Sequence, residues 1–142
     1  MNFLENQSSL EALLIGFENG TWPIADWHHT AHLAVCACYI LDGPDAMDRL
    51  RIRIARYNEN QGGRNTPDSG YHETLTRFWV EMVSISIASL PRNLVRLEVA
   101  RRIVAEFGHR RDLFREYYEF DVVGCREARA VWIPPARNIS TR

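Results

Sequence analysis

The sequence predicts an all-α fold, a single-domain helical bundle of about six helices. Apolar residues recur every three or four positions through most of the chain, which is the spacing of one helix face. No segment keeps up the alternation of apolar and polar residues that a half-buried strand needs. At 142 residues the chain has the length of one domain and needs no disulfide to fold. We therefore treat residues 1–142 as one helical domain with a loose tail at 136–142.

The first predicted helix covers about residues 8–19. Ser8 and Glu11 match a capping box, in which the serine caps the helix and the glutamate reaches back to it. The leucines that follow recur at helical spacing and give this helix one apolar face. Gly20 is a natural end, because glycine readily adopts the left-handed conformation found after many helices.

The second predicted helix carries the histidine cluster and runs to about Leu41. Asp26 or Thr30 is placed to cap it. Its residues are apolar nearly all round. Such a helix is expected at the centre of a bundle, where each of its faces meets another helix.

Further helical segments follow. The third predicted helix covers about residues 45–58 and precedes the one long loop, residues 60–70, which is rich in turn-forming residues. A loop of this length in a compact domain is often functional. Further helices are expected at 71–90, with strand as the weaker alternative for the second half, at 94–107, and in shorter form from 112 and at 125–131.

The composition excludes several kinds of chemistry. All seventeen basic residues are arginine, so no lysine is present for a Schiff base, a pyridoxal phosphate anchor or a phosphate-binding loop. The three cysteines, Cys36, Cys38 and Cys125, are too few for a disulfide framework. We interpret them as small apolar residues of the core.

Charge and hydropathy predict neither a nucleic-acid partner nor a membrane partner. The net charge of −1 gives no general attraction to nucleic acid or to acidic lipids. No stretch resembles a signal peptide or a membrane span, which makes the cytoplasm the expected location. A homodimer is consistent with the base rates of oligomeric proteins.

Histidines are the main candidates for chemistry. His28, His29 and His32 lie within five positions at the start of the second helix. Residues three or four apart share a helix face, so His32 can pair with His28 or with His29 but not with both. His72 begins a later helix and is able to face this pair across the bundle, with Glu73 beside it as a ligand or general base.

Imidazoles that converge from two helices are suitable ligands for zinc, iron, nickel or copper. Three protein ligands with an open fourth position form the arrangement of catalytic zinc sites. Zinc would indicate hydrolase or lyase chemistry, and iron would indicate oxygenase chemistry. The alternative is that these histidines cap helices or pair with carboxylates, since two histidines three apart are a weak signal.

Other side chains are candidates for a pocket near the histidines, although aromatic residues at helical spacing more often belong to the core. Those that we expect to line it are Tyr57, Asn58, Tyr71, Trp79 and Trp132. The arginines of the C-terminal third are interleaved with acids, which is typical of solvated faces. Among them, Arg129 is the one that we predict to bind the substrate as a clamp.

Four motifs together resemble a family of small, largely uncharacterised bacterial helical proteins. They are Trp27-x-His29-x-x-His32-Leu33, Tyr57-Asn58 before a glycine-rich loop, Gly70-Tyr71-His72-Glu73-Thr74, and Ala128-Arg129-x-x-Trp132-x-x-Pro135. The resemblance covers roughly residues 27–135, and the motif around His72 is its most specific part. It implies a helical domain without a settled activity, and it favours His29 over His28 as the partner of His32.

We predict a metal-dependent enzyme that acts on a small molecule between these helices. The predicted ligands of a divalent transition metal (zinc, iron, nickel or copper) are His29, His32 and His72, and the predicted catalytic residues are Glu73, Tyr57 and Arg129. Two alternatives stay open. One is a non-catalytic protein that binds a metal or a small ligand in the same pocket, and the other is a helical interaction module with structural histidines.

Overall fold

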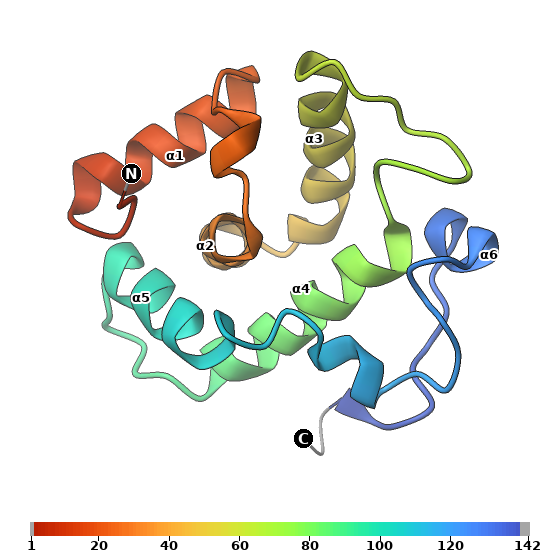
Figure 1. The fold of residues 1–142 in the computed structure, drawn as a ribbon. Coiled ribbons are helices and arrows are strands. Elements are labelled where there is room, and N and C mark those ends of the chain that lie inside the picture. The colour runs from red at the N-terminus through yellow and green to blue at the C-terminus, as the bar shows by residue number, and fades with distance from the viewer. Residues whose placement is uncertain (1, 140–142) are drawn as a thin grey trace.

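The computed structural model describes residues 2–139, and its regular segments are all helical (Figure 1). The α-helices are α1 (Gln7–Asn19), α2 (His29–Asp42), α3 (Ala46–Asn60), α4 (Glu73–Ala88), α5 (Arg96–Phe107) and α6 (Arg126–Ala130), with the 3-10 turns η1 (Ile24–Asp26) and η2 (Leu113–Glu116). The predicted fold class, an all-α bundle of about six helices, is confirmed. Because α4 stays helical to Ala88, the alternative of a strand in its second half is wrong.

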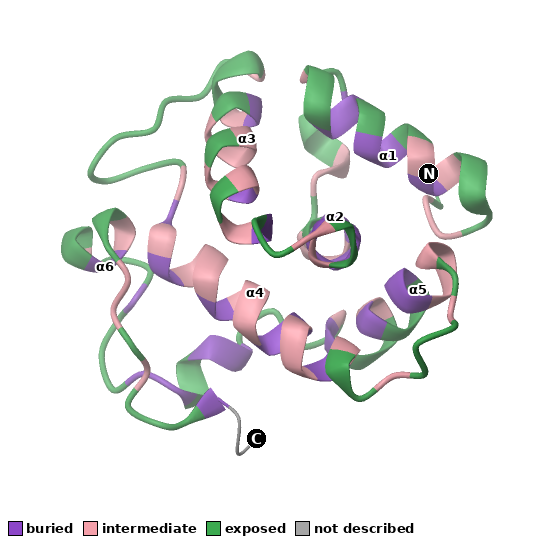
Figure 2. Cartoon of the chain, turned by 180° about the vertical axis from the view of Figure 1, so that it is seen from behind, coloured by how far each residue is buried: buried purple, intermediate pink, exposed green. Residues whose placement is uncertain are grey.

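Helix α2 lies at the centre of the bundle. Figure 1 shows it end-on, with α1, α3, α4 and α5 around it. Every residue from Leu33 to Tyr39 is buried, and the same helix is largely purple in Figure 2. A helix that is surrounded in this way has no face left for charged residues, which explains its all-round apolar sequence. Its position agrees with the prediction.

The cysteines of α2 are core residues, as predicted. Cys36 and Cys38 are buried free thiols. Burial raises the pKa of each thiol to about 12, so both stay protonated at neutral pH.

The start of α1 differs from the prediction, and its end does not. Asn6 caps the helix, because its side-chain oxygen accepts a hydrogen bond from the Ser9 N–H at 2.9 Å. The predicted capping box at Ser8 is therefore wrong. Gly20 ends the helix in the left-handed region, with φ of 79°, as expected.

Helix α2 begins directly after His28, so neither Asp26 nor Thr30 caps it. Asp26 belongs instead to the turn η1, and Thr30 lies inside the first turn of α2. The His28 side chain makes no capping hydrogen bond. As a result, the histidine cluster lies at the N-terminal end of α2, ahead of its buried middle.

The C-terminal segment packs on the bundle as far as the structure describes it. The Ala136 N–H donates to the Tyr117 carbonyl at 2.9 Å, and Ile139 is buried in the core. Residues 136–139 of the predicted loose tail thus have contacts with the bundle at both ends, and its looseness stays a prediction. The rest of that tail, residues 140–142, lies outside the described residues.

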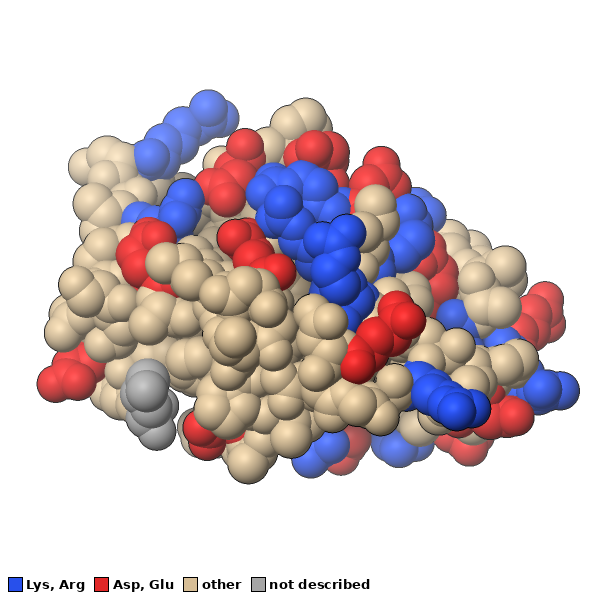
Figure 3. Space-filling model, turned by 90° about the horizontal axis from the view of Figure 1, so that it is seen from above, with Lys and Arg blue, Asp and Glu red and all other residues tan. Residues whose placement is uncertain are grey.

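Acidic and basic side chains lie interspersed on the face of the molecule shown in Figure 3. None of the helices within residues 2–139 has the length and apolar character needed to cross a lipid bilayer.

Candidate ligand-binding site

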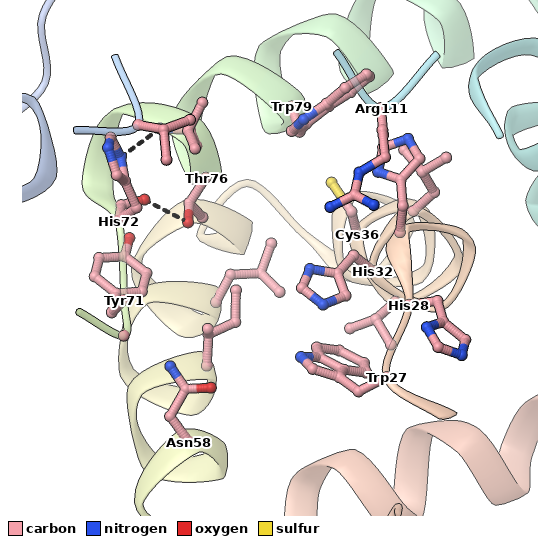
Figure 4. Close-up of a pocket in the computed structure, with 18 of the residues that line it drawn as sticks. Trp27, His28, His32, Cys36, Asn58, Tyr71, His72, Thr76, Trp79 and Arg111 are labelled. Carbon is pink, nitrogen blue, oxygen red and sulfur yellow. Dashed lines mark hydrogen bonds between the residues drawn. The ribbon is translucent and has the colours of Figure 1, made fainter. Parts of the chain in front are cut away.

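A pocket of about 1060 Å³ opens among α2, α3 and α4, and we call it the central pocket (Figure 4). The loop between α3 and α4 and the turn after α5 complete its walls. Its volume is slightly above the range of typical small-molecule sites, which span roughly 300–1,000 Å³. The aliphatic side chains of the lining are Ile24, Leu33, Val35, Leu50, Ile54, Leu75, Val80 and Val123, and Trp27, Trp79 and Phe114 add apolar aromatic surface.

Trp27 forms a rigid aromatic wall of the central pocket. One contact of its ring is a stack on Phe17, with ring centroids 5.0 Å apart and planes at 14°. The His32 ring lies 4.0 Å from the same indole, centroid to centroid. Since Phe17 is buried in the core, these contacts fix both the tryptophan and the histidine in orientation.

His29 lies at the other aromatic wall, beside Trp79. The two ring centroids are 4.8 Å apart. The Nε2 atom of His29 lies 3.1 Å from the Phe107 carbonyl oxygen, which only accepts, so this nitrogen carries the hydrogen of the neutral ring. Burial is the main cause that lowers the pKa of His29, and the hydrogen bond to Phe107 opposes it in part.

His32 points into the central pocket and is accessible to solvent through the opening (Figure 4). The surrounding protein nevertheless lowers its pKa, first by desolvation and then through the charges of His29, His28 and Arg111. A hydrogen bond with the Trp27 backbone has the opposite effect. The His32 ring is therefore neutral at neutral pH. The His28 ring is turned away from it (Figure 4).

His72 does not act as the predicted metal ligand in this structure, because both of its ring nitrogens are already bonded. Nδ1 accepts a hydrogen bond from the Leu75 N–H at 3.1 Å, which makes His72 the N-cap of α4. Nε2 lies 2.9 Å from the carbonyl oxygen of Val122 and donates to it. The ring is buried, and this burial lowers its pKa. The residue lines the central pocket without offering it a free nitrogen.

The structure does not bring the three predicted ligands together as a metal-binding group, and the predicted metal stays a prediction. Within residues 2–139, no group of three or more histidine, cysteine, aspartate or glutamate side chains is placed to hold a metal ion. His29 and His32 share the pocket-facing side of α2, as their spacing predicts. The third ligand is missing, because the orientation of His72 is set by the helix cap.

Glu73, predicted as a ligand or general base, is bonded to its neighbours instead. Arg51 donates to it twice, from Nε at 2.9 Å and from an Nη at 2.7 Å, and the Tyr71 hydroxyl donates at 2.7 Å. The two-pronged bond with Arg51 holds the pKa of Glu73 below its ordinary value. A carboxylate held in this way is a poor base, so Glu73 fixes α3 to the start of α4.

Tyr57 and Arg129, the other predicted catalytic residues, also have structural roles. Tyr57 is fully buried, and its hydroxyl donates to the Trp22 carbonyl at 2.6 Å. Arg129 donates to the Gly70 carbonyl at 2.7 Å and so binds the loop before α4. Neither residue belongs to the described lining of the central pocket.

Of the other side chains expected at a pocket, Asn58, Tyr71 and Trp79 do line it. Trp132 does not belong to the described lining and packs under the Arg77 guanidinium, 4.7 Å from its ring centroid. The Asn58 amide donates to Asn65 at 3.1 Å, which helps to shape the loop at the pocket rim.

Arg111 is the pocket residue that sequence reasoning missed. It extends from the turn after α5 toward His32 and Cys36 (Figure 4). The turn is fixed at both ends, since Gly108 N–H donates to Val104 at 2.7 Å and Leu113, at the other end, is buried. The sequence signal is slight, because Arg111 lies in a run of charged residues that resembles a solvated face.

Comparisons with protein-family models, with curated proteins and with solved structures found no match to this chain. The resemblance to a bacterial helical family accordingly stays a prediction.

Proposed function

We propose that this protein binds a small organic molecule in the central pocket. The observation that supports this best is a pocket of about 1060 Å³ whose walls are mainly apolar and aromatic. A few polar groups from separate elements, among them His32, Arg111 and Asn58, converge on the same space. That combination is typical of sites for organic ligands.

His32 would contribute a hydrogen-bond acceptor to this site. Its neutral ring carries one hydrogen, on one of its two nitrogens. The second ring nitrogen then offers a lone pair. A ligand hydroxyl or N–H group is the natural partner for it.

Ligand-observed NMR with a fragment library tests the proposal. The matched variants are Ile54→Trp and Ile52→Trp, both on α3. Ile54 lines the central pocket, so the larger side chain fills it, whereas Ile52 is 57% exposed and lies outside the described lining. Fragments are expected to bind the wild-type protein and Ile52→Trp, and to lose binding to Ile54→Trp.

Thermal unfolding of both variants verifies that the fold is retained, and Val80→Trp, on the α4 wall, serves as a second filling variant. The proposal is overturned when no fragment binds the wild-type protein, or when the same fragments bind the filled variants with unchanged affinity.

Catalysis is the second candidate function, favoured by the accessible and neutral imidazole of His32. Such a group is able to act as a general base. Turnover of a bound molecule that is lost in His32→Gln, with binding retained, would support this function. Chelator treatment separates this general-base function from the metal-dependent enzyme predicted from the sequence. The metal-dependent enzyme would lose activity on chelation and regain it on addition of zinc, iron, nickel or copper.

A further inference from the structure

We infer that the ligand of the central pocket is an organic monocarboxylate with a flat apolar body, anchored by Arg111. This inference rests on the proposed function and names the class of molecule that the pocket would select.

Arg111 is a cation with no carboxylate bound to it among the described residues. The neighbouring basic residues of the same segment are paired: Arg110 with Glu116 at 3.4 Å and Arg115 with Asp112 at 3.7 Å. No ion pair of this kind involves Arg111 within residues 2–139. Its guanidinium is instead directed into the central pocket (Figure 4).

The charges of the lining favour an anion. The charged side chains of the described lining are Arg64, Arg111, Asp112 and Arg115. Asp112 is paired with Arg115, which leaves two arginines without an acid in the same pocket. An anionic group that enters the pocket therefore meets a positive field.

The hydrogen-bonding capacity around Arg111 fits a carboxylate better than a phosphate dianion. A guanidinium presents two parallel N–H groups, which match the two oxygens of a carboxylate. A phosphate dianion needs several further donors. The two imidazoles nearby add little, since the N–H of His29 already donates to Phe107 and a neutral His32 carries only one N–H.

The flat apolar body is inferred from the two tryptophans of the lining. Trp27 and Trp79 both line the central pocket and are half-buried. Each ring is held by core aromatics, with Phe17 at 5.0 Å from Trp27 and Phe78 at 5.2 Å from Trp79. Preorganised aromatic faces bind a planar ring at little cost in side-chain entropy.

Isothermal titration calorimetry with three naphthalene probes tests the inference. The probes are 2-naphthoate, the neutral 2-naphthamide and 2-naphthyl phosphate. They are compared on the wild-type protein, Arg111→Gln, Arg111→Lys and the control Arg110→Gln, a neighbour that lies outside the lining. Unfolding curves confirm that each variant is folded.

The naphthoate is expected to bind the wild-type protein and Arg110→Gln more tightly than the other two probes. Arg111→Gln should weaken naphthoate binding at least about tenfold, because it removes a charge-assisted hydrogen bond, and should leave naphthamide binding unchanged. The affinity of Arg111→Lys for naphthoate should lie between those of the wild-type protein and Arg111→Gln, since lysine keeps the charge and loses the two-pronged geometry.

Equal binding of naphthoate and naphthamide, or naphthoate binding that is unaffected by Arg111→Gln, overturns the inference and leaves the proposed small-molecule site intact. Tighter binding of the naphthyl phosphate also overturns it. Failure of every probe, together with failure of the fragment screen, would instead overturn the proposed function itself.

Discussion

Replacing His72 by alanine tests whether this residue is a structural cap or a metal ligand. The substitution removes two hydrogen bonds of a buried ring: the one from the Leu75 N–H at 3.1 Å and the one to the Val122 carbonyl at 2.9 Å. Loss of an N-cap side chain costs about 1 kcal/mol. Loss of a further hydrogen bond costs about 1 kcal/mol. The expected loss is therefore about 2 kcal/mol in the free energy of unfolding, before any loss of packing.

For a domain of this size each 1 kcal/mol corresponds to about 4 °C, so the Tm of His72→Ala should fall by about 8 °C. His72→Asn should recover about 1 kcal/mol, because asparagine is a favoured N-cap and can still accept the Leu75 N–H. His109→Ala is the control, since that side chain is exposed. Urea unfolding followed by circular dichroism gives the free energies. A His72→Ala protein as stable as the control would refute the structural role, especially when it also loses bound metal.

Three further predictions follow from the contacts around the pocket. A double-mutant cycle of Arg51→Gln and Glu73→Gln should give a coupling of about 1 kcal/mol at pH 7. Because the folded-state pKa of Glu73 is lowered, this coupling should disappear as the pH falls through that pKa; a coupling near zero at pH 7 would contradict the assignment. The pKa values of His29, His32 and His72 in the folded protein are lowered from 6.5. Below about pH 6.5 the unfolded state therefore binds more protons than the folded state, so the Tm should fall as the pH is lowered from 7 to 5. A Tm that rises as the pH is lowered from 7 to 5 would show that the three imidazole rings are not held neutral. Arg129→Met should speed amide hydrogen exchange in residues 63–71, because the bond to the Gly70 carbonyl is lost, and unchanged exchange would be the contrary result.

Local patterns of the sequence were sufficient for the helices and for the central position of α2. Apolar spacing defines helix faces, and an all-round apolar segment has to be surrounded. The ends were less predictable. Asn6, Ser8 and Ser9 lie within four positions and are all good or moderate caps, so the packing of α1 decides among them.

The candidate site was predictable only in part, because it depends on contacts between distant segments. Helical spacing placed His29 and His32 on one face, and both reach the central pocket. The same spacing does not say where a ring nitrogen points, and His72 uses both of its nitrogens on the backbone. The position of Arg111 depends on a turn after α5 that packs near the start of α2, a contact that no local pattern encodes.

A crystal structure of the protein with 2-naphthoate, or with the tightest fragment of the screen, is the most direct measurement of the central claim. The account predicts the molecule in the central pocket, with its ring against Trp27 or Trp79 and its carboxylate within hydrogen-bond distance of Arg111. A molecule bound elsewhere on the surface, with the central pocket unchanged, would contradict it.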